Sequence, residues 1–419
     1  MPTDSLKKKN IESNKSTQKG LFNNKYSVAI ITVFSIIVIC IIGSPVIILF
    51  LLILTLIVCI HEFGHFITAK KFEVDVEEFS IGMGPLVVKK DYKGTQYSIR
   101  ALPIGGYVKM LGEGEASDKI GSFSKLKPWK RFIIIYAGVV MNFVLVAIIF
   151  TIFGFKSNFT YFGVSLDENY KFPIGDSGVV KQGISGVEDN SPAKQAGIKS
   201  LDIINKANGQ DYKTIDDYRK IIGDNVEKNI PFEITSYLGG GTKTVSLTPR
   251  DRTKSNLSDT QTNTGIVQGV TFSRVEFHGW SKPFAGILQT INATHNYVST
   301  IGTIINVAIT RKDSSIIVNS VSSPVGTYAV TQKVLNLEGF WGILSLTAFI
   351  SLAIGLMNAF PFPALDGWHG FFIIIEMITG KRINEKLYNA ITIGGFVLLL
   401  ALGILISIKD VLNFSTLFG

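Results

Sequence analysis

The sequence is poor in charged residues, in cysteine and in histidine. Only 17% of its 419 residues are charged while 46% are hydrophobic, which is too apolar for an ordinary soluble chain of this size. The two cysteines, Cys40 and Cys59, both lie in apolar runs, which excludes a disulfide framework and a CxxC metal knuckle. The net charge of +9 is therefore interpreted as a signal of membrane topology, and nucleic-acid binding is not expected. No secretory signal peptide is expected either, because the first apolar stretch lacks a small-residue cleavage site.

Long apolar stretches predict a polytopic α-helical membrane protein. The first, from Tyr26 to Ala69 in the segment 26–71, would be roughly 66 Å long as one helix, more than twice the hydrocarbon thickness of a bilayer. We expect it to break at Gly43-Ser44-Pro45 into two spans, although the sequence leaves open whether 26–43 crosses the membrane or lies in its interface. The other spans are expected at 132–155, in an interrupted stretch at 339–380, and in 381–419 with the C-terminus.

The distribution of lysine and arginine predicts the orientation of these spans. Residues 1–25 carry six lysines against two acids, and the stretch 66–131 carries twelve basic against eight acidic residues. The tail 1–25, the segment 72–131 and the loop that opens 381–419 should therefore be cytoplasmic. Residues 156–338 are nearly balanced, with 19 basic and 17 acidic residues, and should lie on the opposite face.

The most informative motif is His61-Glu62-Phe63-Gly64-His65, which follows a run from Tyr26 to Ile60 without a charged side chain. With only five histidines in the chain, H-E-x-x-H is expected by chance roughly 0.002 times. On one helix His61 and His65 share a face and can reach one Zn²⁺, with Glu62 beside the metal as general base. Three ionisable groups inside an apolar segment are costly unless they have a function.

A zinc site of this kind needs a third protein ligand, and the residues alone leave three candidates in the stretch 339–380. Asp366 follows two prolines that must interrupt the helix, which is tolerated at that depth only beside a cavity or protein interior. Glu376 lies near Lys381 and Arg382 and is better explained as an interfacial ion pair. His369 is better explained as a packing or hydrogen-bonding residue beside the site.

Several motifs together resemble the site-2 protease family of intramembrane zinc metalloproteases, and most closely the bacterial subgroup that cleaves membrane-anchored anti-sigma factors. They cover most of the chain from about residue 45 onward and comprise HEFGH, Ile81-Gly82-Met83-Gly84-Pro85, the run from Pro103 to Met110, the run from Ala137 to Phe143, and the run from Asn358 to Gly367. By this resemblance His61, His65 and Asp366 are the zinc ligands and Glu62 is the catalytic base. The resemblance also makes Asn142 and Asn358 candidates for holding the substrate backbone or the oxyanion, with helix packing as the alternative.

The chain departs from the usual family pattern in two places. Members usually have a second glycine where Trp368 stands, which puts the local backbone approach in question but not the ligation by Asp366. The additional N-terminal span and the Lys/Asn/Ser-rich tail are absent from the usual four-span core.

The cytoplasmic segment 72–131 contains alternating stretches over 72–110 with a turn at Asp91-Tyr92-Lys93-Gly94, which predicts a membrane-associated β-hairpin region. In the resembling proteins such a region meets the substrate as an added strand. The alternative is a small β-subdomain that only packs against its neighbours.

Residues 156–250 should contain a PDZ-type α+β domain at about 178–250. The signal is Val187-Glu188-Asp189-Asn190-Ser191-Pro192-Ala193 followed by Ala196-Gly197-Ile198. PDZ domains bind extended peptide ends by strand addition, and in the family such a domain is pictured as a gate for trimmed substrates. The alternative is a spacer without a ligand, because a fold alone does not fix a function. Residues 251–338 should form a polar linker followed by amphipathic helices that lie on the membrane or clamp this domain.

The resulting prediction is a polytopic α-helical membrane protein with a β-hairpin region and an extracytoplasmic PDZ-type domain, placed in a bacterial cytoplasmic membrane. The expected activity is that of an intramembrane zinc endopeptidase whose site lies near the cytoplasmic side. Its expected partners are the lipid bilayer, single-span membrane substrates such as an anti-sigma factor or a signal-peptide remnant, and a peptide at the PDZ domain. Cleavage requires the substrate helix to unwind.

Two alternatives remain open at this point. An HExxH membrane protease of another fold would take its third ligand from Glu376 instead of Asp366. A non-catalytic PDZ scaffold would tolerate Glu62→Gln, but it has no physical need to keep an acid and two ligands in lipid.

Overall fold

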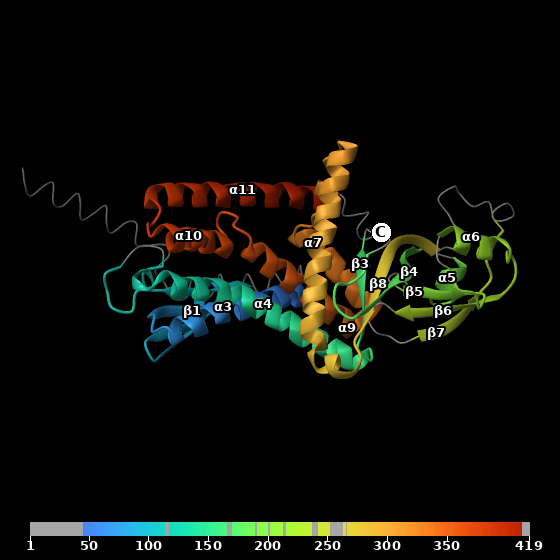
Figure 1. Cartoon of the computed structure of the whole chain (residues 1–419), viewed down its shortest axis with the longest axis horizontal. Coiled ribbons are helices and arrows are strands. Elements are labelled where there is room, and N and C mark those ends of the chain that lie inside the picture. Colours follow the sequence, from blue (N-terminus) through green and yellow to red (C-terminus); the bar gives the residue numbers. More distant parts are fainter. Residues whose placement is uncertain are drawn as a thin grey trace, which may run out of the picture. The chain divides into compact units, whose positions relative to one another are not determined.

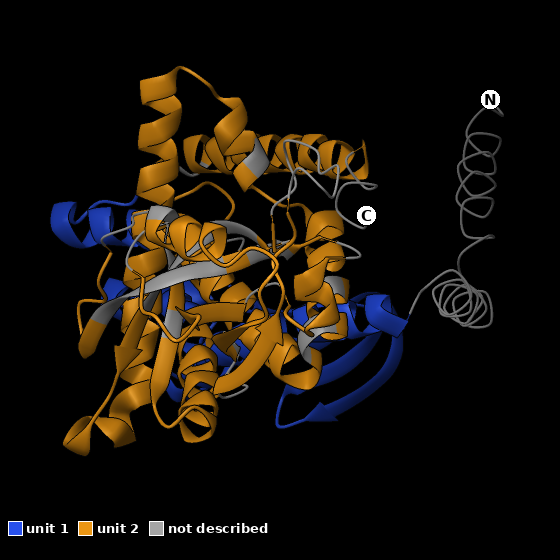
Figure 2. Cartoon of the chain, turned by 90° about the vertical axis from the view of Figure 1, so that its right-hand side faces the viewer, with its two compact units in different colours: residues 1–141, 369–383 blue, residues 142–368, 384–419 orange. Residues whose placement is uncertain are grey.

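The computed structural model describes residues 45–113, 117–165, 170–188, 191–199, 202–212, 215–236, 242–251, 263–264 and 266–412. The chain divides into two compact units, of residues 1–141 with 369–383 and of residues 142–368 with 384–419 (Figure 2). Two of the three boundaries fall within continuous helices, so α4 (Pro128–Lys156) and α10 (Asp366–Thr379) contribute residues to each unit. The third lies after α10, between residues 383 and 384. The predicted tail 1–25 and first span 26–43 lie outside the described residues.

Four described helices are long and apolar enough to cross a membrane, and their ranges match the predicted spans. They are α3 (Pro45–Lys71), α4, the part of α9 (Pro324–Ala359) from Gly339 onward, and Lys386–Leu412 of α11 (Glu385–Leu412) (Figure 1). Gly339 interrupts α9 with a non-helical backbone, φ 58° and ψ −140°. Because glycine adopts positive φ without steric cost, this residue separates the apolar span from the helical segment that precedes it.

The first unit contains a long β-hairpin beside α3. Strands β1 (Val76–Tyr92) and β2 (Thr95–Met110) pair antiparallel and are joined by Lys93 and Gly94, both with positive φ. That is the position of the predicted turn, and two residues with positive φ suit a tight hairpin. The short helix η1 (Phe123–Lys125) then leads to α4. A buried cluster that includes Ala69, Val76 and Met110 joins the C-terminal end of α3 to the hairpin.

The second unit contains a six-stranded antiparallel sheet of order β3-β8-β4-β5-β6-β7. Its elements are β3 (Thr160–Ser165), β4 (Asp176–Val187), α5 (Pro192–Gln195), β5 (Asp202–Ala207), α6 (Ile215–Gly223), β6 (Ile230–Ser236), β7 (Thr242–Leu247) and β8 (Ile266–Glu276). Its core is built from side chains of β5, β6 and α6, such as Ile204, Phe232 and Ile221. The segment 251–338 was expected to hold only a linker and helices, but its residues 266–276 form β8, which returns to pair with both β3 and β4. This pairing joins segments that are distant in the chain, so no local sequence pattern indicates it.

Helices follow the sheet, as the sequence predicted for this stretch. They are η2 (Gly279–Phe284), α7 (Ala285–Arg311), α8 (Ser315–Ser320) and the first part of α9. Asn292 of α7 accepts a hydrogen bond from the N–H of Ile174 and donates one to its carbonyl, at 3.1 and 2.8 Å. These two bonds attach α7 to the loop that precedes β4.

A turn separates α9 from α10, where the sequence predicted an interruption. It spans 360–365 and contains Pro361 and Pro363, neither of which can donate a backbone hydrogen bond. Ala364 has φ 76°, a left-handed conformation that is uncommon for a residue with a Cβ. Asp366 follows two residues later as the first residue of α10.

Candidate metal centre

Helix α3 brings His61 and His65 together on one face. Their Nε2 atoms lie 3.2 Å apart and their rings meet edge to face, with centroids 4.8 Å apart. Both side chains are buried, at 5% and 6% exposure. The spacing of four residues produces this geometry, because residues i and i+4 are neighbours on a helix. Two imidazole nitrogens therefore point at the same small volume.

The ring of His65 is oriented by the backbone of α4. Its Nδ1 lies 2.8 Å from the carbonyl oxygen of Ile134. A carbonyl only accepts, so Nδ1 must carry the hydrogen, and Nε2 is then the nitrogen with the lone pair that can bind a metal. This is the second contact that metal-binding histidines commonly make.

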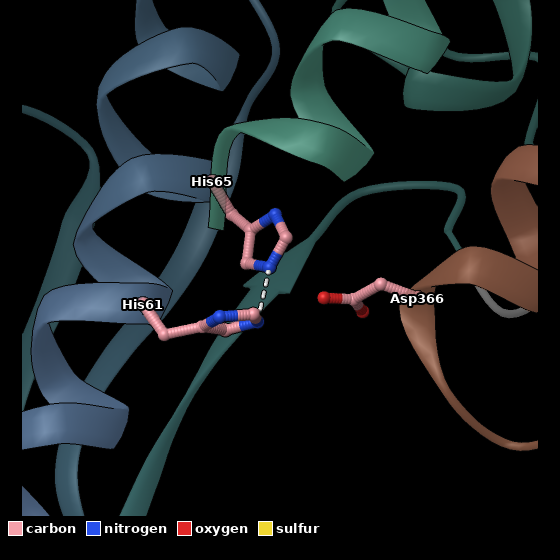
Figure 3. A group of neighbouring side chains, drawn as sticks. All are labelled: His61, His65 and Asp366. Carbon is pink, nitrogen blue, oxygen red and sulfur yellow. Dashed lines mark hydrogen bonds between the residues drawn. The ribbon is translucent and has the colours of Figure 1, made fainter. Parts of the chain in front are cut away.

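Asp366 completes a group of three possible metal ligands. One ligand atom from each of His61, His65 and Asp366 lies within 4.8 Å of the others (Figure 3). Asp366 is half-buried and begins α10. Among the described residues this is the group of His, Cys, Asp and Glu side chains that could hold a metal ion, and it does not include His369 or Glu376.

The donor set and the space around it fit zinc. Two nitrogens bound to one tetrahedral zinc ion at about 2.05 Å are roughly 3.3 Å apart, close to the 3.2 Å between the two Nε2 atoms. Gly138 of α4 lies against the same atoms, and a Cβ there would be 2.7 Å from His61 Nε2 and closer still to that of His65. Only glycine at this position leaves the two nitrogens room to face a shared ion.

Glu62 lies on α3 between the two histidines and is held by the hairpin. Its carboxylate accepts a hydrogen bond from the backbone N–H of Val108 in β2, at 3.0 Å. One turn earlier on α3, the sulfur of Cys59 lies 4.0 Å from the carbonyl oxygen of Gly105. One further turn towards the start of α3, the Thr55 hydroxyl donates a hydrogen bond to the carbonyl of Pro103. This face of α3 therefore follows β2 along its length, and the strand reaches the acid of the motif.

The two candidate asparagines lie on different helices. Asn142 is on α4, four residues beyond Gly138, and is fully buried. Within the described part of the chain, neither its Oδ1 nor its Nδ2 has a hydrogen-bond partner. A buried amide without partners is costly, so this side chain has the capacity to bind a further group. Asn358 is half-buried in the last turn of α9.

Glu376 is engaged away from the cluster. Its Oε1 lies 2.6 Å from the guanidinium of Arg131 on α4 and 3.1 Å from that of Arg382. The side chains of Arg131 and Glu376 are only 9% and 14% exposed. The prediction that Glu376 forms an ion pair is therefore confirmed, with Arg131 as a partner that the sequence did not indicate.

Two of the residues that support the cluster cannot be recognised from the sequence alone, although both lie in motifs described above. Gly138 belongs to the run from Ala137 to Phe143, and Val108 to the run from Pro103 to Met110. These two motifs are the sequence features that point to Gly138 and Val108. A motif alone does not show which of its atoms faces a histidine on another helix.

Comparison with known proteins gives consistent matches. Peptidase family M50 matches residues 49–402 of this chain. A protein of Clostridium acetobutylicum, whose name describes it as a zinc metalloprotease, is 34% identical over 355 residues, 85% of this chain and 94% of that protein. A similarly named protein of Clostridium perfringens is 32% identical over 365 residues, 86% of this chain and 97% of that protein. Another, from Fusobacterium nucleatum, is 32% identical over 359 residues, 85% and 96% of the two chains.

Proposed function

Because this chain belongs to peptidase family M50, the site-2 protease family, and is a zinc metalloprotease, we propose that it hydrolyses a peptide bond in or near the transmembrane helix of a single-span substrate. The observation that carries the proposal is the group of His61, His65 and Asp366, whose ligand atoms lie within 4.8 Å of one another. Two of these residues lie on α3, a helix apolar enough to cross a membrane. A site on such a helix serves substrates that are themselves in the membrane.

In this proposal His61, His65 and Asp366 hold the zinc ion, which supplies a Lewis acid for attack on a peptide carbonyl when it is bound. The Ile134 carbonyl keeps His65 in the tautomer whose Nε2 can ligate. Gly138 keeps the volume in front of both nitrogens clear. Burial of both imidazoles excludes bulk water from competing for their lone pairs.

Glu62 acts as the general base. It takes a proton from the attacking water and passes it to the leaving amine, which requires an ionised carboxylate in a fixed position. The hydrogen bond from the Val108 N–H supports this role, because a donor at 3.0 Å holds the carboxylate oxygen in place and limits rotation of the side chain.

Asn142 and Asn358 contact the substrate backbone or the oxyanion. The support for Asn142 is its fully buried amide, whose two polar atoms have no partner among the residues that the structure describes. An extended peptide offers both a donor and an acceptor to such an amide. For Asn358 the support is its place just before the turn that leads to Asp366.

The remaining parts of the proposal concern where the substrate meets the chain. A substrate helix must unwind before its peptide bond is accessible, and the hairpin of β1 and β2 offers strand edges for such an extended segment. Residues 178–250, with β4 to β7, α5 and α6, form a PDZ-type domain outside the cytoplasm that selects peptide ends. The protein resides in a bacterial cytoplasmic membrane with the metal centre near the cytoplasmic side, and anti-sigma factors are the substrate class.

The test is a cleavage assay on purified protein in detergent with a single-span model substrate, together with zinc stoichiometry. We expect one zinc per chain in the wild type. Glu62→Gln should keep zinc and lose cleavage, whereas Asp366→Asn should lose both. Glu376→Gln is the comparison variant, because its side chain is bound by Arg131 and Arg382 and should not be required for zinc. Since it breaks a buried ion pair, it is assayed below its own melting temperature.

Other outcomes would point to the alternatives. If Glu376→Gln loses zinc while Asp366→Asn binds it fully, Glu376 is the third ligand and the protein is an HExxH protease of a different fold. A wild type that binds no zinc and cleaves nothing would contradict the proposed centre.

A further inference from the structure

Helix α11 is held by few contacts. Only 6% of its most apolar window is buried, and Ile393, Phe396 and Leu405 are each more than half exposed, at 64%, 57% and 62%. Its position within the second unit therefore depends on the few side chains that it does engage.

One of these contacts is with Trp368, the residue that departs from the usual motif. The indole N–H donates a hydrogen bond to Thr392 Oγ1 on α11, at 2.9 Å. The Thr392 hydroxyl gives its own hydrogen to the carbonyl of Tyr388, at 2.8 Å, so its oxygen is left to accept from the indole. The rings of Trp368 and Tyr388 stack, with centroids 6.4 Å apart and planes at 21°.

A second contact lies one turn further along the same face of α11. Gly395 packs against Pro363, and a Cβ on it would come within 3.0 Å of the Cγ of that proline. Tyr388, Thr392 and Gly395 are spaced i, i+4 and i+7, so they form one face of the helix. This face meets the segment 363–368.

That segment carries Asp366 and contains a strained residue. Ala364 has φ 76°, and a non-glycine residue keeps such a conformation only where its surroundings hold it. Pro363 and Trp368 flank the strained residue and Asp366, and both are the residues that α11 contacts. The contacts of α11 thus enclose the proposed ligand on both sides.

We infer that Trp368 is a positioning residue for Asp366: by fixing the segment 363–368 on α11, it holds the Asp366 carboxylate where the ligand atoms of His61 and His65 converge. The inference rests on the proposed zinc site. It gives the last helix a role beyond anchoring, as the support of a metal ligand.

The test measures the zinc affinity of the full-length protein in detergent by competition with a chelator. Trp368→Phe keeps an aromatic ring and removes the N–H, Thr392→Val removes its acceptor, and Gly395→Ala adds the Cβ that meets Pro363. We expect Trp368→Phe and Thr392→Val each to weaken zinc binding roughly 5- to 10-fold, the size of one lost hydrogen bond transmitted to the ligand. Gly395→Ala should weaken it at least as much, because the added Cβ pushes Pro363 away from α11. Trp368→Phe combined with Thr392→Val should be no worse than either alone, since both remove the same bond.

Two other residues give matched controls. Thr347 makes the same backbone bond as Thr392, to the carbonyl of Ile343 at 2.8 Å, and is not bonded to a tryptophan. Gly394 is a helical glycine with nothing within 4 Å of its added Cβ. Thr347→Val and Gly394→Ala should bind zinc like the wild type.

The outcomes separate this inference from the proposed function. Zinc affinities of Trp368→Phe and Thr392→Val equal to that of Thr347→Val would overturn the positioning role, even if both variants melt earlier, because the contact would then be packing only. Asp366→Asn is measured in parallel. If it too binds zinc normally, the proposed metal centre itself fails; if it loses zinc while Trp368→Phe does not, only the positioning role fails.

Discussion

Gly138 is the residue on which the space around the two histidine Nε2 atoms depends. A Cβ there would lie 2.7 Å from His61 Nε2, so Gly138→Ala forces the rings or the helices apart. We expect at least about a tenfold loss of zinc affinity, as for other residues that support a metal ligand, measured by chelator competition. Gly302→Ala is the control, since nothing lies within 4 Å of its added Cβ. If Gly138→Ala binds zinc as tightly as the wild type, the two histidines do not bind a shared zinc ion next to Gly138.

Also at the residue scale, Glu78 makes the stability of the hairpin depend on pH. Burial alone raises the pKa of Glu78, but hydrogen bonds from Ser98, Arg100 and Tyr107 lower it from the ordinary 4.5 to about 2. A carboxyl group whose pKa is lowered on folding contributes its full stability above the unfolded pKa, and loses it as the pH falls through the folded pKa. We therefore expect protection of the β1 and β2 amides against hydrogen exchange to decline between about pH 4.5 and pH 2.

The control for this effect is Glu78→Gln, which cannot titrate. Its hairpin should be less protected near neutral pH and should change less over the acid range. The same acid-induced loss of protection in both proteins would assign the effect to other carboxylates.

At the scale of elements, the pair of Arg131 and Glu376 joins the start of α4 to the end of α10. Both side chains are nearly buried, at 9% and 14% exposure, and removing one partner of a buried pair leaves a charge without compensation. Arg131→Gln should therefore destabilise the protein by about 3 to 5 kcal/mol, seen as a lower melting temperature in detergent.

Arg382 offers the comparison, because it contacts the same carboxylate but is 52% exposed. Arg382→Gln should cost less than about 1 kcal/mol, as exposed ion pairs do. Replacing both members of the buried pair, Arg131→Met with Glu376→Leu, should recover much of the loss. Equal effects of the two arginine variants would contradict this account.

Some of the helices, turns and contacts could be predicted from the sequence, and others could not. The helix with HEFGH, the spans and the turn before Asp366 were predictable, because apolar length, proline and the i, i+4 spacing are local properties of the chain. The pairing of Arg131 with Glu376 was not, since 245 positions separate them. The bond between Val108 and Glu62, 46 positions apart, and the return of β8 to the sheet are of the same kind. Such contacts depend on how segments pack, which periodicity does not encode.

At the scale of the whole molecule, the proposed orientation can be tested with single cysteines in a background lacking Cys40 and Cys59. Lys90 in β1 and Lys228 before β6 are both exposed. An impermeant thiol reagent on intact cells should label Lys228→Cys and leave Lys90→Cys unlabelled until the membrane is opened. Asn10→Cys should behave like Lys90→Cys if 26–43 crosses the membrane. Labelling of Lys90→Cys in intact cells would reverse the proposed topology.

The support of His65 has a consequence for mutational mapping. Its acceptor is the main-chain carbonyl of Ile134, whose two lone pairs can serve both the α4 helix bond from residue 138 and the imidazole. No side-chain substitution removes that oxygen, so alanine scanning would not detect this contact. The orientation of the His65 ring thus depends on the backbone of α4. A survey of the amino acids tolerated at position 134 would report only how well each side chain packs, and not the hydrogen bond to His65.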